Sequence, residues 1–466
     1  MQTNQRNLND KLPFKVKLSY GFSGYCSFVT WTVFSYYGLY FMTENVGLSA
    51  AFAGAIISLG TLWDAITDPL IGTISDNIKN PKGRRRPLLK YIAIPFIIIS
   101  LLLFTNWGFS ESVQKVYFVV VILVYYTCQT VVDISASSLG SEMTNDYNER
   151  ASLATWKNYF GLLPTVIVGL MLTLSSFFEN AFHTTKFGWT FAIACFMVVW
   201  AVLMFCLYKN TEGYERPRDE NAEKVEGFKP KDIVDLFKNK ATRIVMVIFG
   251  LGILVNTINY SIQVYYYTVY VGLTEGQVAV ATMAFGIASI VCAYFCDLIM
   301  AKKDKKFAWI VSVGSEGLVL VIFVGFIIAQ NSASLPLVVV MMILMSLGNA
   351  AIYQVPWAMI PDCVDVNELA SGKRTDGIIF GAVAFVQKAC GAIGALILGL
   401  LITASGGSPI AFKLMFGFAV GGAYLLSVLI VMKYPLSEKR HDDVIEAIEE
   451  RKNGREVDLA DFSDLI

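Results

Sequence analysis

The chain contains a series of apolar segments that are each long enough to cross a lipid bilayer, and this feature restricts its fold most. A membrane-spanning helix needs about 20 mainly apolar residues. Because backbone polar groups in lipid must be paired within the protein, such segments fold as helices. The sequence therefore predicts an all-α membrane protein with twelve transmembrane helices. They are expected at residues 18–42, 50–76, 88–107, 116–141, 151–178, 186–208, 244–271, 276–300, 307–329, 335–361, 377–404 and 409–432.

Composition excludes several classes of function. Only 16 % of the 466 residues are charged, whereas an ordinary soluble chain carries about 25 %. Equal numbers of basic and acidic residues, 37 of each, argue against a nucleic-acid partner. The two histidines, His183 and His441, are too few and too far apart for histidine-based metal or nucleophilic chemistry. The chain has no HExxH, GxSxG or Walker-type motif, so we expect neither enzymatic activity nor a cofactor.

Basic residues predict the orientation in the membrane. An even number of spans places both termini on one side. The segments on that side hold 32 of the 37 Lys and Arg residues, and the opposite side holds only Lys115, Lys186 and Lys413. Basic loops remain in the cytoplasm. We therefore expect a multi-pass protein of the inner (plasma) membrane, with both termini cytoplasmic.

One long hydrophilic connection, residues 209–242, divides the predicted spans into two groups of six. We expect an N-terminal six-helix bundle at 1–208, a C-terminal six-helix bundle at 243–432 and a cytoplasmic tail at 433–466. The acidic part of this tail is expected to begin as a short amphipathic helix and to be solvated.

The two halves also resemble each other. After the second span, Asp76 precedes Gly83-Arg84-Arg85-Arg86-Pro87, and after the eighth span Asp297 precedes Lys302-Lys303-Asp304-Lys305-Lys306. Two six-helix halves related by an internal repeat are typical of major-facilitator transporters, whose substrate site lies between the halves near the middle of the membrane.

Acidic residues inside the spans are the most informative, because a charge in lipid is costly and marks an ion or substrate path by default. The second span contains Trp63-Asp64-Ala65-Ile66-Thr67-Asp68-Pro69. Asp64 and Asp68 lie one turn apart on one helix face, and Pro69 leaves the carbonyl four residues before it without a helical partner. Two carboxylates, the Thr67 hydroxyl and this carbonyl offer oxygen ligands to a small cation. Alternatively, the carboxylates share a proton.

Other polar residues within spans are candidates for the same site. Thr130 and Asp133 share one face of the fourth span. Lys157 and Lys388 are the basic residues deep in predicted spans, one in each half, and either is a possible structural partner for the buried acids. Glu316 lies in the middle of the ninth span, where it is either a structural or a functional acid.

Further motifs run along nearly the whole chain: Tyr20-Gly21-Phe22, the Trp63–Pro69 run, Asp76 with Gly83-Arg84-Arg85-Arg86-Pro87, Asp133-Ile134, Trp357-Ala358-Met359-Ile360-Pro361-Asp362, Gly372-Lys373-Arg374 and Phe385-Val386-Gln387-Lys388. In combination they resemble the glycoside–pentoside–hexuronide:cation symporters. The resemblance implies a major-facilitator fold. It also implies symport of a sugar or glycoside (pentoside, oligosaccharide or hexuronide) with Na⁺ or H⁺ by alternating access, and we expect the protein to work as a monomer in the bilayer.

The resemblance also implies roles for single residues in cation binding. Asp64 and Asp68 match the family's cation-binding acids, and Thr130 matches a threonine that helps to bind the cation. Thr67, which we add to this set, stands where the family's best-known member has asparagine. This difference leaves Na⁺ and H⁺ open as the coupling ion.

The sugar-binding side departs further from the family pattern. Asp133 matches a sugar-binding acid and Lys388 a lysine near the cation site, but Phe28 and Ser137 replace a sugar-binding aspartate and a sugar-stacking tryptophan. Lys157 falls within one residue of a family arginine, where it pairs with a uronate or neutralises Asp133.

Polar and aromatic residues away from the span ends complete the candidate substrate-binding set. Sugar sites combine hydroxyl-bonding groups with aromatic rings, and Asn259, Tyr353 and Gln354 fit this description. Asn259, together with Asp133 and Lys157, argues against the alternative of a lysolipid carrier, which would need an apolar cavity. A transceptor that senses sugar without transporting it is a further alternative.

Charged loop residues after the fourth and tenth spans are candidates for a cytoplasmic gate. They are Glu142, Asp146 and Arg150 in one half and Asp362, Asp365 and Arg374 in the other. We expect cross-half or loop-to-helix locks, because exposed ion pairs are weak enough to rearrange in every cycle. The alternative is that these are solvated loop charges.

Overall fold

The computed structural model describes residues 11–78, 83, 85–144, 146–184, 186–215, 239–331, 333–371, 376–453, 455 and 458–465. The chain forms two compact units. The first consists of Met1–Glu223, Leu273–Gly286 and Gly399–Ala404. The second consists of Lys224–Gly272, Ile287–Leu398 and Ser405–Ile466.

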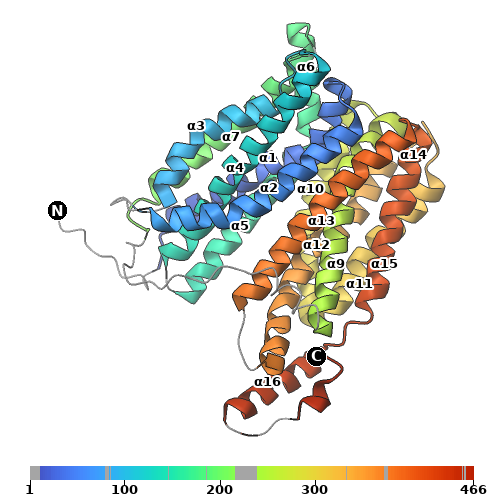
Figure 1. Cartoon of the computed structure of the whole chain (residues 1–466). Helices are drawn as coiled ribbons and strands as arrows, with labels where there is room; N and C mark the ends of the chain where they lie inside the picture. Colours follow the sequence, from blue (N-terminus) through green and yellow to red (C-terminus); the bar gives the residue numbers. More distant parts are fainter. Residues whose placement is uncertain are drawn as a thin grey trace, which may run out of the picture. The chain divides into compact units, whose positions relative to one another are not determined.

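Helices form the architecture of the described residues (Figure 1). The first part of the chain contains α1 (Phe14–Tyr40), η1 (Phe41–Asn45), α2 (Ala50–Asn77), α3 (Arg85–Leu103), α4 (Glu111–Met143), α5 (Tyr147–Ile167), α6 (Leu170–Phe182) and α7 (Gly188–Asn210). The remainder contains α9 (Lys240–Tyr265), η2 (Tyr266–Tyr270), α10 (Glu275–Lys302), α11 (Lys305–Val319), η3 (Leu320–Ile327), α12 (Leu335–Ser371), α13 (Asp376–Ser405), α14 (Pro409–Lys413), η4 (Leu414–Val420), α15 (Gly421–Val431), α16 (Glu438–Lys452) and η5 (Leu459–Phe462). The all-α prediction is confirmed.

Eleven of the twelve predicted spans have the length and apolar composition of a transmembrane segment in the described residues. Ten are single helices, and α5 and α6 together form an eleventh that bends by 48°. The predicted span at 18–42 forms α1, but α1 is too polar to meet the same criterion. Its serines and threonines, including Ser23, Ser27 and Thr30, are buried. The structure therefore accommodates the polarity of α1 by packing it against other helices.

The closest helix crossing in the first unit joins α1 to α5. A Cβ atom added to Gly24 would lie 1.9 Å from the backbone oxygen of Lys157 and 2.7 Å from the backbone nitrogen of Gly161. Only glycine fits at such a distance. This contact places the backbone of Lys157 directly against α1.

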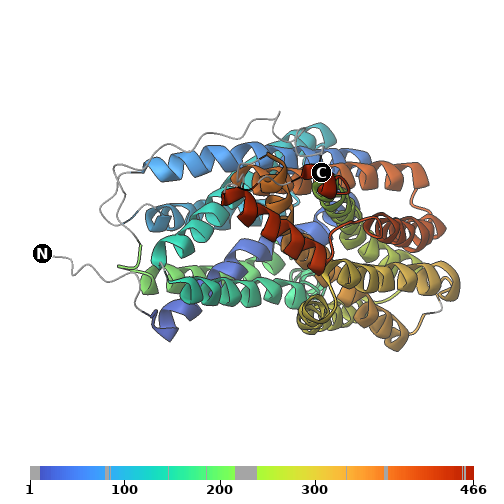
Figure 2. The same ribbon diagram turned by 90° about the horizontal axis from the view of Figure 1, so that it is seen from below.

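The C-terminal tail is part of the second unit and packs against α12. It forms the predicted amphipathic helix, α16, which lies across the end of α12 (Figures 1 and 2). Val444, Ala447 and Ile448 are buried, and Arg451 donates a 2.7 Å hydrogen bond to the Leu369 carbonyl of α12. The expectation of a solvated tail is therefore wrong, because the apolar side of α16 has a protein surface to cover.

The end of the chain reaches the start of α9. The backbone nitrogens of Lys240 and Ala241 donate to the Leu465 carbonyl, at 3.1 and 3.4 Å, and the Leu465 side chain is fully buried. These bonds satisfy two amides in the first turn of α9, which has no helical acceptors for them.

Candidate functional site

The candidate cation site brings α2 and α4 together. The Thr130 hydroxyl on α4 donates a 2.6 Å hydrogen bond to Asp64 Oδ1 on α2. The Thr67 hydroxyl lies 3.2 Å from the Thr130 hydroxyl and 3.2 Å from the Asp64 carbonyl. Both threonines are buried, and Asp64 is half-buried. Three of the four predicted cation-binding residues therefore form one cluster of oxygen atoms.

Asp68, the fourth residue of that prediction, lies one turn further along α2 and is half-buried. Pro69 follows it inside the helix. A proline in this position removes one helical hydrogen bond and leaves a carbonyl oxygen available to a ligand. The assignment of Asp68 to the cation site stays a prediction.

Asp133 lies one turn beyond Thr130 on α4 and is held by Gln129. The Gln129 amide donates to Asp133 Oδ2 at 2.9 Å and to the Ser27 carbonyl of α1 at 2.6 Å. Its oxygen accepts a 3.2 Å hydrogen bond from the Thr30 hydroxyl. Gln129 thereby fixes the acid relative to α1, a role that the sequence analysis did not assign.

Lys157 on α5 points toward α4. Its ammonium group donates a 2.7 Å hydrogen bond to the Ser137 hydroxyl, and the side chain interacts electrostatically with Asp133. Asp133, Ser137 and Lys157 therefore present a carboxylate, a hydroxyl and an ammonium group in one region. Such a set can bind sugar hydroxyls, and the ammonium group can also bind a carboxylate.

A second polar cluster lies inside the second unit. The Asn259 amide on α9 donates to Glu316 Oε1 on α11 at 3.0 Å and to the Tyr424 hydroxyl on α15 at 3.4 Å. Next to it, the Tyr260 hydroxyl donates to Asn349 Oδ1 at 2.7 Å. Asn259 is thus part of a buried network.

The other predicted substrate-binding residues also lie in the second unit. Tyr353 on α12 interacts with Tyr260. Gln354 and Lys388 are half-buried, on α12 and α13. Gln354 Oε1 has no hydrogen-bond partner among the described residues, so it is available to a donor from a ligand.

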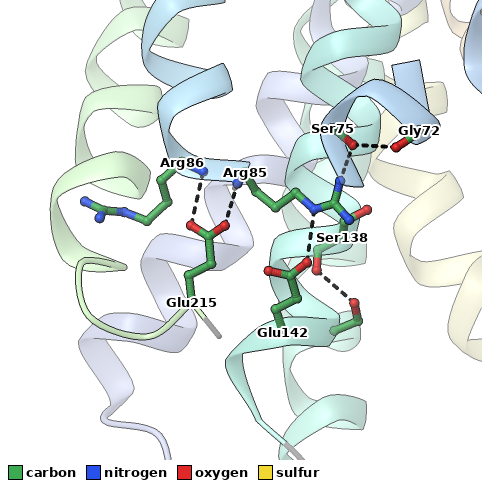
Figure 3. Close-up of polar contacts among 8 residues, drawn as sticks. Gly72, Ser75, Arg85, Arg86, Ser138, Glu142 and Glu215 are labelled. Atoms are coloured by element: carbon green, nitrogen blue, oxygen red, sulfur yellow. Dashed lines mark hydrogen bonds and ion pairs between the residues drawn. The ribbon is translucent and has the colours of Figure 1, made fainter. Parts of the chain in front are cut away.

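Arg85 joins three helix ends in the first unit (Figure 3). Its guanidinium group donates to Glu142 at the end of α4, at 3.0 Å, and to the Ser75 hydroxyl near the end of α2. Its backbone nitrogen donates to Glu215, which follows α7. The basic loop is visible in the sequence, and its repetition in both halves is the one signal that points to this arrangement.

The start of α5 holds the other candidate gate residues of this unit. Asp146 caps the helix by accepting a 2.8 Å hydrogen bond from the Glu149 backbone nitrogen. Arg150 donates a 2.9 Å hydrogen bond to the Thr144 carbonyl. Both residues therefore bind the local backbone, as helix caps and loop contacts commonly do.

The corresponding end of the second unit carries a cluster of charged residues. Lys305 at the start of α11 binds both Asp362 carboxylate oxygens at 2.7 Å. His441 of α16 lies 3.1 Å from Asp365 and 3.9 Å from Asp362. The sequence analysis missed Lys305 and His441 as partners. Arg374, the remaining gate candidate, lies outside the described residues.

Comparison with known proteins identifies the family. Residues 19–438 match the family model described as MFS/sugar transport protein. The chain belongs to this family. The match covers every helix from α2 to α15, so it includes both polar clusters described above. The resemblance noted in the sequence is thereby confirmed.

Three curated bacterial proteins are similar to this chain over most of their length. An inner membrane symporter of Escherichia coli is 27 % identical, covering 91 % of this chain and 92 % of that protein. A glucuronide carrier protein homolog of the same organism is 23 % identical, covering 98 % and 100 %. An isoprimeverose transporter of Lactiplantibacillus pentosus is 24 % identical, covering 85 % and 81 %.

Solved structures show the same fold at low sequence identity. A D-xylose-proton symporter superimposes with a TM-score of 0.65 at 14 % identity, over 92 % of this chain and 99 % of that one. A nucleoside transporter superimposes with a TM-score of 0.63 at 12 % identity, over 90 % and 98 %. The major-facilitator fold of this family is therefore common to transporters of different cargo.

Proposed function

We propose that the protein is a secondary active transporter that carries a sugar or glycoside across the inner membrane together with Na⁺ or H⁺. The hydrogen bond between Thr130 and Asp64 carries the proposal, because it assembles oxygen ligands inside a membrane helix pair. The names of relatives that carry a glucuronide or isoprimeverose support a sugar or glycoside as the cargo.

The coupling cation binds at Asp64, Asp68, Thr67 and Thr130 in this proposal. Two carboxylates carry the charge that attracts a cation, and the two hydroxyls each add a neutral oxygen. The hydrogen bond that Thr130 donates to Asp64 keeps the carboxylate in position before the cation arrives. A proton can bind to the same carboxylates, so the proposal includes both Na⁺ and H⁺ as coupling ions.

In this proposal each unit carries polar residues that suit a sugar or glycoside. In the first unit, Asp133 accepts hydrogen bonds from sugar hydroxyls, and Lys157 donates to a hydroxyl or a uronate. The second unit contributes Asn259, Tyr353, Gln354 and Lys388. Gln129 lies directly before Thr130 and four residues before Asp133, to which it donates a hydrogen bond, so the proposed cation and cargo sites share α4.

Gating and orientation complete the proposal. The positive-inside rule places both termini in the cytoplasm. In each transport cycle, contacts at the cytoplasmic side form and break. The residues proposed to make them are Glu142, Asp146, Arg150, Asp362, Asp365 and Arg374. In the described structure Glu142 pairs with Arg85 and Asp362 pairs with Lys305, each within its own unit. One chain holds all the proposed sites, which supports function as a monomer.

Uptake into membrane vesicles tests this function. Vesicles that contain the protein are given an inward Na⁺ or H⁺ gradient and a panel of radiolabelled pentosides, glycosides and hexuronides. We expect one of these sugars to accumulate above its outside concentration, and Asp64→Asn and Asp68→Asn to lose this accumulation. Asp442→Asn is the matched control, because Asp442 is an exposed carboxylate of α16.

Two results would contradict the proposal. If Asp64→Asn and Asp68→Asn both accumulate sugar as the parent protein does, these acids do not bind the coupling ion. If a sugar binds to the purified protein but no gradient drives its uptake, the protein senses sugar without transporting it.

A further inference from the structure

Glu316 is an acid in the apolar interior of the second unit that the proposed coupling site does not use. It lies on α11, within a helix that has the composition of a membrane span, and it is fully buried. The proposed cation-binding acids, Asp64 and Asp68, belong to the first unit. Glu316 therefore needs an explanation of its own.

The carboxyl group of Glu316 has few hydrogen-bond donors. Oε1 accepts the 3.0 Å hydrogen bond from Asn259, whereas Oε2 has no partner among the described residues. Oδ1 of Asn259 also lacks a partner there. The cluster therefore contains two buried oxygens that can accept a hydrogen bond but receive none.

Gly348 on α12 provides the space for this carboxyl group. A Cβ atom added to Gly348 would lie 2.3 Å from Glu316 Oε2 and 2.9 Å from the Ser312 carbonyl. Any other residue at 348 would displace the acid. The packing of α12 on α11 is thus fitted to a carboxyl group at 316.

The other titratable groups that face Glu316 are phenols. Tyr424 comes from α15 and Tyr260 from α9, and both interact electrostatically with the acid. Tyr353 of α12 lies beside Tyr260. None of these three side chains carries a positive charge. Desolvation strongly disfavours an ionised carboxylate at this position, and a single amide hydrogen bond does not offset that cost.

We infer that Glu316 is a proton-binding site: it holds a proton in the state seen here and releases it when the contact between α9 and α11 opens to water. A proton on Oε2 neutralises the buried charge and turns this oxygen into a donor. An acid retained at this cost in a membrane span is expected to be functional. The inference adds a second ionisable site to the proposed function and does not depend on the identity of the cargo.

Infrared difference spectroscopy of the purified protein tests this inference with the proton itself as the probe. The carbonyl stretch of a protonated carboxyl group is recorded while the pH is stepped from neutral to alkaline and back. We expect the band to be present at neutral pH, to disappear when the pH is raised and to return when the pH is lowered again. Glu316→Gln should lack the band. Glu111→Gln, which alters an exposed acid paired with Lys115, should keep it.

Three results would overturn the inference. A band that is missing at neutral pH means that Glu316 is ionised, and a band that persists throughout the alkaline range means a permanently protonated structural acid. Loss of the band when Na⁺ is added at constant pH means that the site binds Na⁺. If Glu316→Gln does not fold, Asn259→Ala replaces it, and removal of the hydrogen bond to Oε1 should then shift the band.

Discussion

At the residue scale, one hydroxyl joins the two helices of the candidate cation site. The Thr130 hydroxyl lies 2.6 Å from Asp64 Oδ1 and 2.9 Å from the Tyr126 carbonyl of its own helix, so these two acceptors compete for its one proton. Because its oxygen lies 3.2 Å from the Thr67 hydroxyl, Thr130 is the link between Asp64 and Thr67. The cluster should therefore be sensitive to this one oxygen atom.

Thr130→Val removes the hydroxyl and keeps the shape of the side chain. Hydrogen bonds to charged groups contribute about 1.5–3 kcal/mol, so we expect the Na⁺ or H⁺ concentration for half-maximal uptake to rise by about tenfold or more. Thr130→Ser keeps the hydroxyl and is the control. Equal cation dependence of the two variants would exclude Thr130 from the cation site.

A second residue-scale prediction concerns the glycine at the crossing of α1 and α5. Gly24→Ala places a Cβ atom against the Lys157 carbonyl, which is backbone and cannot rotate away. Overpacking of this kind costs about 1–3 kcal/mol, so thermal unfolding of the purified protein should begin at a lower temperature. Gly72→Ala in α2 is the control, since nothing lies within 4 Å of its added Cβ atom. An equal decrease in the unfolding temperature of both variants would argue against the close crossing of α1 and α5.

At the element scale, an acid at the start of α5 holds the residues that precede α1. Glu149 accepts hydrogen bonds from the Leu12 backbone at 2.9 Å and from Lys17 at 2.8 Å. Burial raises the pKa of Glu149, but these bonds outweigh it, so its pKa lies below the usual value for glutamate. Because the pKa is lower in the folded protein, the contact is present at neutral pH and is lost as the pH falls through the lowered value.

Hydrogen exchange checks this pH dependence. We expect the protection factor of the Leu12 amide to decrease as the pH falls below about 4.3, the ordinary pKa of glutamate. Glu149→Gln should show the lower protection already at neutral pH, with little change on acidification. A protection factor that falls equally with pH in Glu149→Gln would mean that another group controls the contact.

A second prediction at the element scale concerns the packing of α16 on α12. Val444 is fully buried, and burial of a valine side chain contributes about 1.5–3 kcal/mol. Val444→Asp should therefore release α16 from α12 and expose Arg440 and Arg451 to trypsin. Asp442→Ala changes an exposed position of the same helix and should be cut at the parental rate. If both variants resist cleavage equally, Val444 does not hold the helix.

At the scale of the whole molecule, the lengths of the apolar segments predicted the helices well, because a helix that crosses lipid needs about 20 mainly apolar residues. Eleven predicted spans meet the same criterion in the structure, and the exception, α1, shows where that reasoning is weakest. A helix enclosed by other helices no longer has to be apolar, so hydropathy alone cannot separate it from a soluble segment. The position of α16 was missed for the opposite reason, since its partner surface on α12 is distant in sequence.

The candidate site was predictable where residues share a helix and less so where helices meet. The spacing of Asp64, Thr67 and Asp68 follows from helical geometry. The partners of Asp362 were missed, because Lys305 and His441 come from two other elements. Gln129 was not predicted although it is adjacent to Thr130. An uncharged amide in a span has no charge that marks it as functional until its neighbours in the structure are known.

The bond between Leu465 and the start of α9 has a practical consequence for purification. An affinity tag fused directly after Ile466 would disturb the packing of the buried Leu465 side chain. It would also disturb the Leu465 carbonyl, which accepts hydrogen bonds from Lys240 and Ala241. A Gly/Ser spacer between Ile466 and the tag would leave these bonds intact, since such linkers are flexible. Any fusion placed after Leu465 should therefore leave these two hydrogen bonds in place.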